Sequence, residues 1–118
     1  MATSTLIYGF LGTGKISSAV CTGFCTLSLD RRPARILVSE RSLEKSHALR
    51  ESFPDIVEIV ASNEEIVRRS DIVFIGLLPA VANEVLPQMP WDNCQLVVSM
   101  MAAVSFEKVT NEVVFSIY

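Results

Sequence analysis

The sequence predicts an α/β fold, in which helices cover both faces of a doubly wound, mostly parallel sheet within one domain spanning residues 1–118. Apolar runs and helical patterns alternate along the whole chain at the spacing of strand–helix–strand units. The run at 71–78 is the most apolar and has almost no polar alternation, which indicates a central parallel strand buried on both faces. A glycine pair follows the first apolar run directly, as is typical of this fold class.

Each expected strand ends at a turn or at a helix-start signal. Pro79 fits the first turn of a helix, whereas Pro87 and Pro90 prevent that helix from continuing. Ser62 and Glu65 have the spacing of a capping box at the start of another helix. The expected strands are residues 5–11, 34–39, 55–61, 71–78 and 95–100, with 113–118 as one further candidate, and the expected helices are residues 15–29, 43–52, 62–69, 79–86 and 105–111.

The first expected helix carries an apolar stripe at i, i+3 and i+4 spacing, which predicts the face that packs on the sheet. Cys21 and Cys25 share one face of this helix, but the chain has only three cysteines and one histidine. Buried free thiols in a reducing compartment are therefore expected, rather than a disulfide framework or a zinc site. The stripe consists of Ile16, Ala19, Val20, Gly23, Phe24 and Leu27.

Composition argues against nucleic acid and membrane partners. The net charge is −3, and the chain has no basic cluster beyond Arg31, Arg32 and Arg35. No apolar run is long enough to span a membrane, and the N-terminus lacks the pattern of a cleaved signal peptide. We therefore expect a cytoplasmic protein.

The turn at Gly12 and Gly14 has the features of a phosphate-binding site. It lies between a predicted strand and a predicted helix, and the first turn of a helix presents unpaired N–H groups and a positive dipole end to anions. Gly12 permits the tight turn, and Gly14 lets the backbone approach a pyrophosphate because it has no Cβ. Ser17, at the third position of the motif, is small enough for close packing of helix on strand.

The same residues also fit the GxxxxGK pattern of nucleotide triphosphatases. That loop requires Ser or Thr directly after Lys15 to bind magnesium, whereas the chain has Ile16 there. A dinucleotide site is therefore the favoured interpretation, and a glycine-rich turn that binds nothing remains as the second alternative.

The end of the second strand predicts contacts to the adenosine ribose. Glu40 is an acidic residue that would accept hydrogen bonds from the ribose hydroxyls of NAD. Arg41 next to it, with hydroxyls on Ser39 and Ser42, suits the 2′-phosphate of NADP instead. Ser42 also fits as the cap of the next helix, and Arg41 equally fits as an ordinary solvated charge.

The carboxyl ends of all parallel strands meet at one edge of the sheet, where ligands of such folds bind. This rule predicts one cofactor crevice from five separate segments. They are residues 12–16, 39–41, 61–63, 77–79 and 100–103.

Five blocks of the chain, in the same order, resemble the N-terminal domain of the pyrroline-5-carboxylate reductase family. The family opens with a GFIGAGNMA-like run, and residues 9–17 here read GFLGTGKIS. The other blocks are residues 38–45 (VSERSLEK), Asn63 at the start of the third helix, residues 71–75 (DIVFI), and residues 96–99 (LVVS) followed by a small-residue turn and Val104-Ser105.

The resemblance implies a Rossmann-like domain that binds NADP (NADPH) or NAD and serves the reduction of 1-pyrroline-5-carboxylate to proline. The hydride would pass from the nicotinamide to the imine carbon of this small-molecule substrate. The resemblance also implies a homo-oligomer in the full-length form. Carried over by position, Gly12, Thr13, Gly14, Lys15 and Ile16 would hold the pyrophosphate, Ser39, Arg41 and Asn63 would lie by the adenosine ribose, and Leu77, Leu78, Pro79 and Ala102 would border the nicotinamide half.

The chain departs from the family pattern in three places. Residues 77–80 read LLPA where the family has Val-Lys-Pro-Gln, and residues 101–103 read MAA where it has Ala-Ala-Gly. The family's C-terminal helical domain, which forms the dimer and the substrate pocket, is not expected within residues 1–118. Two alternatives therefore stay open: another NADP-dependent oxidoreductase of the same group, or a non-catalytic nucleotide-binding module. No catalytic residue is proposed, since His47 is expected to be solvated.

Overall fold

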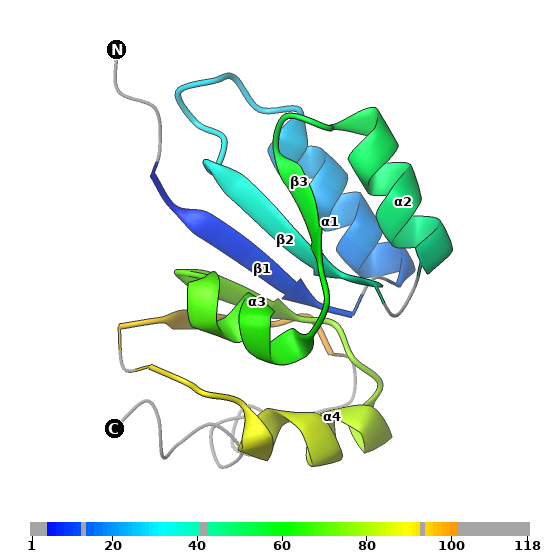
Figure 1. The fold of residues 1–118 in the computed structure, drawn as a ribbon, viewed down its shortest axis with the longest axis vertical. Helices are drawn as coiled ribbons and strands as arrows, with labels where there is room; N and C mark the ends of the chain where they lie inside the picture. The colour runs from blue at the N-terminus through cyan, green and yellow to red at the C-terminus, as the bar shows by residue number, and fades with distance from the viewer. Residues whose placement is uncertain (1–4, 13, 41–42, 93, 102–118) are drawn as a thin grey trace.

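The computed structural model describes residues 5–12, 14–40, 43–92 and 94–101 (Figure 1). Within them, strands and helices alternate along the chain as the sequence predicts. The helix expected at 105–111 and the strand expected at 113–118 lie outside the described residues. In this part of the chain, no helix has the length and apolar character needed to cross a membrane.

The five strands of the described chain form one sheet in which every neighbouring pair is parallel, in the order β3-β2-β1-β4-β5. This confirms the predicted doubly wound, Rossmann-like architecture, whose strand order reverses beside β1. Strand β4 ends three residues earlier than expected, because Leu78 already forms the N-cap of the next helix. The strands are β1 Ile7–Leu11, β2 Arg35–Ser39, β3 Val57–Val60, β4 Ile72–Ile75 and β5 Leu96–Ser99.

The helices lie on the two faces of the sheet (Figure 1). Because successive strand residues point to opposite faces, Phe10 packs in the core beneath α1 and α2, and Leu11 packs in the core beneath α3 and α4. Phe10 also stacks on Phe74 of the neighbouring strand, with ring centroids 4.8 Å apart. The helices are α1 Lys15–Cys25, α2 Leu43–Ser52, α3 Asn63–Arg69 and α4 Pro79–Val85, followed by the 3-10 turn η2 Leu86–Gln88.

Helix α1 differs from its prediction in both length and orientation. It ends at Cys25 rather than at residue 29, and Thr26 Oγ1 donates a hydrogen bond back to the Gly23 carbonyl at 3.0 Å. Its buried residues are small, whereas Ile16 of the predicted stripe is 61% exposed. The predicted face was right for Val20 and Phe24, which pack against the core, and wrong for Ile16, because the fully buried positions of α1 carry small side chains. The buried residues of α1 are Ser17, Cys21 and Cys25, and the third cysteine of the chain, Cys94, is exposed; none of the three cysteines is in a disulfide.

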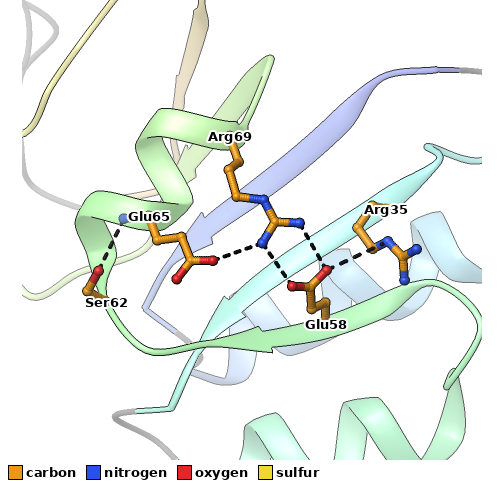
Figure 2. Close-up of polar contacts among 5 residues, drawn as sticks. All are labelled: Arg35, Glu58, Ser62, Glu65 and Arg69. Atoms are coloured by element: carbon orange, nitrogen blue, oxygen red, sulfur yellow. Dashed lines mark hydrogen bonds and ion pairs between the residues drawn. The ribbon is translucent and has the colours of Figure 1, made fainter.

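An ionic network fastens α3 to the edge of the sheet (Figure 2). The Arg69 guanidinium donates to both carboxylate oxygens of Glu58 on β3, at 2.8 and 3.0 Å, and to Glu65 at 2.9 Å. These hydrogen bonds hold the pKa of Glu58 below its ordinary value. Ser62 caps α3 through a 3.2 Å bond from Glu65 N, so the predicted Ser half of the capping box is confirmed, while the Glu65 carboxylate bonds to Arg69.

Candidate functional site

The carboxyl ends of the strands lie side by side and form what we call the rim. Gly76 N donates to the Leu11 carbonyl at 2.8 Å, and Met100 N donates to the Ile75 carbonyl at the same distance. The turns that follow β1, β4 and β5 are therefore adjacent, although they are far apart in the sequence. This confirms the convergence of strand ends from which the crevice was predicted.

Gly12 makes the turn out of β1 with a φ of +92°, in the left-handed region that favours glycine. A Cβ at this position would lie 2.6 Å from the Gly76 carbonyl oxygen. Both the backbone conformation and the close approach of β4 require glycine here. The predicted role of Gly12 in a tight turn is confirmed.

Gly14 is the N-cap of α1 and has an ordinary φ of −75°. A Cβ at Gly14 would meet nothing within 4 Å, so a free space faces the start of the helix. The first turn of α1 contains no acidic residue, and its Lys15 is exposed. N–H groups of a first helical turn have no intrahelical acceptor, so this arrangement favours an anion at the start of α1.

Close packing between α1 and β4 places the helix start against the rim. Ser17 is 3% exposed, and its Oγ would lie 2.3 Å from a Cβ added to Gly76. Gly76 is therefore needed for α1 to approach the sheet, a role that sequence reasoning missed. The available signal was a glycine at the end of the most apolar strand.

A cavity of about 440 Å³ opens at the rim between α1 and the turns after β4 and β5; we call it the rim cavity. It brings the glycine-loop residues together with the residues predicted for the nicotinamide half. Met100 and Met101, from the segment 100–103 that was predicted to form part of the crevice, also border it. The lining residues are Gly14, Lys15, Ile16, Ser17, Gly76, Leu77, Leu78, Pro79, Met100 and Met101.

The residues predicted for the adenosine half lie on the other side of β1 and do not line the rim cavity. Ser39 is the buried last residue of β2, Glu40 follows it and is exposed, and Asn63 is the first residue of α3. A buried hydroxyl on α2, Ser46 Oγ, donates to the Ser39 carbonyl at 2.6 Å. Three predicted site residues, Thr13, Arg41 and Ala102, fall outside the described residues.

The rim cavity holds little that would serve as an acid or base. Lys15 is the only charged side chain among its lining residues, and the remainder are glycine, serine, proline and apolar side chains. The described residues contain no group of three or more side chains suited to hold a metal ion. His47 is exposed on α2, away from the rim cavity, as expected. The described lining of the rim cavity is therefore mainly apolar, with one positive charge at Lys15.

A family model described as "NADP oxidoreductase coenzyme F420-dependent" matches residues 7–103. No curated protein sequence matches the chain. The expectation of an NADP-type coenzyme agrees with the description of this family.

Among solved structures, the chain is similar to a pyrroline-5-carboxylate reductase from Coxiella burnetii (TM-score 0.78, 22% identity, 93% of this chain and 40% of that chain covered). It is also similar to the Plasmodium falciparum pyrroline carboxylate reductase with NADP bound (TM-score 0.74, 22% identity, 95% and 39% covered). A third similar structure is a reductive aminase from Aspergillus terreus in complex with NADPH and ethyl-5-oxohexanoate (TM-score 0.71, 17% identity, 96% and 38% covered). The chain thus spans about two fifths of the length of these proteins, and at such identities the likeness concerns the fold.

Proposed function

Because the chain belongs to the family of NADP oxidoreductases described as coenzyme F420-dependent, we propose that it is the coenzyme-binding part of an NADPH-dependent reductase. One observation carries the proposal: the free space in front of Gly14, at the positive end of a helix without acidic residues in its first turn. The pyrophosphate of a dinucleotide requires both an electropositive helix start and an absent Cβ.

The two halves of the coenzyme are assigned to opposite sides of β1. The pyrophosphate would lie on residues 12–16, with the adenosine ribose beside Ser39, Glu40, Arg41 and Asn63 near β2 and β3. The nicotinamide half would enter the rim cavity, which is bordered by Leu77, Leu78 and Pro79. NADPH supplies the hydride when bound, and the apolar side chains at this end of the site would orient the ring and exclude water.

We propose 1-pyrroline-5-carboxylate as the substrate, reduced at its C=N bond to proline. The five sequence blocks along the chain support this, and so does the likeness of the fold to two pyrroline-5-carboxylate reductases. A substrate pocket and a homo-oligomer are part of this proposal for the full-length protein. Cytoplasmic location remains a prediction on the same basis.

A titration of NADPH into the 118-residue chain, with proline formation followed in parallel, tests this proposal. Binding is the expected result. Proline formation would support the complete reductase activity, whereas binding without turnover would favour a coenzyme-binding part that depends on a separate substrate domain. Failure to bind either NADPH or NADH would contradict the proposal.

A second candidate is an NADPH-dependent reductase with a different carbonyl or imine substrate. Leu78 favours it, because this side chain lines the rim cavity and is 74% exposed at a position where the resembled family carries a lysine. Assays that compare pyrroline-5-carboxylate with other carbonyl and imine substrates, on a chain extended beyond Tyr118, would separate the two candidates.

The choice between NADPH and NADH is testable at Arg41. If this guanidinium binds the 2′-phosphate, Arg41→Ala weakens NADPH binding more than NADH binding. An equal effect on both coenzymes would leave Glu40 as the residue that selects between them.

A further inference from the structure

A buried hydroxyl links α2 to the end of strand β2. Ser46 has no exposed surface, and its Oγ donates to the Ser39 carbonyl at 2.6 Å, across seven positions of the sequence. Serine hydroxyls inside helices commonly bond to a carbonyl one turn earlier in the same helix. Ser46 instead bonds outside its helix, to the last residue of the neighbouring strand.

This hydrogen bond lies where the chain leaves the sheet toward the predicted adenosine site. Ser39 is 4% exposed and pairs in register with Val60 of β3, whereas the next residue, Glu40, is exposed at the rim. This hydrogen bond joins two buried groups on different elements, so it holds α2 against the end of β2. The direction in which Glu40 leaves the sheet therefore depends on Ser46.

We infer that Ser46 is a positioning residue for the adenosine half of the coenzyme, an inference that rests on the proposed function. Ser46 does not contact the coenzyme; it fixes the strand end that presents Glu40 to the ribose hydroxyls. A carboxylate forms a useful hydrogen bond only within a narrow range of distance and angle, so a loosened strand end weakens that contact. The coenzyme contacts proposed at the start of α1 and in the rim cavity do not involve the hydrogen bond between Ser46 and Ser39.

Two partial ligands separate the adenosine half of the site from the nicotinamide half. ADP-ribose carries the adenosine and the pyrophosphate, whereas reduced nicotinamide mononucleotide lacks the adenosine. In the 118-residue chain, Ser46→Ala should weaken ADP-ribose binding about fivefold, the order of one hydrogen bond. Binding of reduced nicotinamide mononucleotide, followed in the same chain by NMR titration, should not change.

Ser70→Ala is the matched control. Ser70 is also buried, at 5% exposure, but its Oγ has no hydrogen-bond partner and it lies at the end of α3. This variant should bind both ligands as the unaltered chain does. If Ser46→Ala caused a general loss of packing, the binding of both ligands would weaken together, and a positioning role would be contradicted. Unchanged binding of ADP-ribose would contradict it as well. If the unaltered chain itself bound no ADP-ribose, the proposed function would fail together with this inference.

Discussion

Gly12 and Gly14 lie two residues apart in one loop, but different requirements act on them. Gly12 has a φ of +92°, and a Cβ there would lie 2.6 Å from the Gly76 carbonyl oxygen. Gly14 has an ordinary φ of −75°, and a Cβ there would touch nothing within 4 Å. The fold therefore requires glycine at 12, whereas only a ligand would require it at 14. Substitutions at these two positions separate folding from binding.

The largest expected effect is on folding. Gly12→Val places a branched side chain in the left-handed region and against a backbone oxygen, and we expect the free energy of unfolding to fall by about 3 kcal/mol. Urea unfolding followed by circular dichroism measures this change. Gly23→Val, an exposed position in α1 where a Cβ meets nothing, is the matched control and should change stability little. If Gly12→Val lowered the free energy of unfolding no more than Gly23→Val, the claim that the fold requires glycine at position 12 would be contradicted.

The next effect is on binding alone. Gly14→Val fills the space in front of α1, and we expect NADPH affinity to fall about thirtyfold, or roughly 2 kcal/mol. Stability should change by no more than about 1 kcal/mol, since valine is a poorer N-cap than glycine. NADPH fluorescence and urea unfolding on the same sample give both values, and Gly14→Ala should show a smaller loss of affinity. Unaltered NADPH affinity in the valine variant would refute the placement of the pyrophosphate.

A smaller effect is expected where β4 meets α1. Gly76→Ala would bring a Cβ to 2.3 Å from Ser17 Oγ, and rotation of that hydroxyl should limit the loss of unfolding free energy to about 1 kcal/mol. Ser17→Ala in the same chain should recover part of the loss. A double-mutant cycle measures this coupling. Strict additivity of the two substitutions would show that Ser17 and Gly76 are not in contact.

The smallest effect lies away from the loop, in the network of Figure 2. Arg69 lowers the folded-state pKa of Glu58 from its ordinary 4.5, so the ion pair stabilises the protein above pH 4.5 and this contribution disappears as the pH falls through the lowered pKa. Both side chains are more than a third exposed, so Glu58→Gln should cost at most about 1 kcal/mol at neutral pH. The variant should lose less stability on acidification, and NADPH affinity should stay unchanged. A stability curve parallel to that of the unaltered chain throughout the acid range would rule out this contribution.

The parts of the fold that were predictable depend on local signals. The alternation of apolar runs and helix signals predicted five parallel strands, and Gly12 predicted the turn after β1. The buried face of α1 was predictable only in part: Val20 and Phe24 of the predicted stripe pack against the core, but the helix approaches the sheet so closely that Ser17 is buried while Ile16 is exposed. Hydropathy periodicity assigns the larger apolar residues to the core and cannot register such a close approach.

The candidate site was predictable to a similar degree. Motif spacing identified Gly14 and Lys15, and the convergence of strand ends added Leu77 and Leu78. Gly76 was missed because its role comes from contacts with residues distant in the sequence. The hydrogen bond from Ser46 to the Ser39 carbonyl was missed for the same reason, since the sequence pattern of a helix does not indicate which group a serine hydroxyl will bond to.

The central claim is that the backbone at the start of α1 binds the pyrophosphate of a redox dinucleotide. The most direct measurement is a titration of NADPH into the ¹⁵N-labelled chain, with the amide chemical shifts followed residue by residue. The account predicts that the largest shifts fall on Gly14, Lys15, Ile16 and Ser17. Shifts concentrated elsewhere, with these four amides unmoved at saturating NADPH, would contradict it.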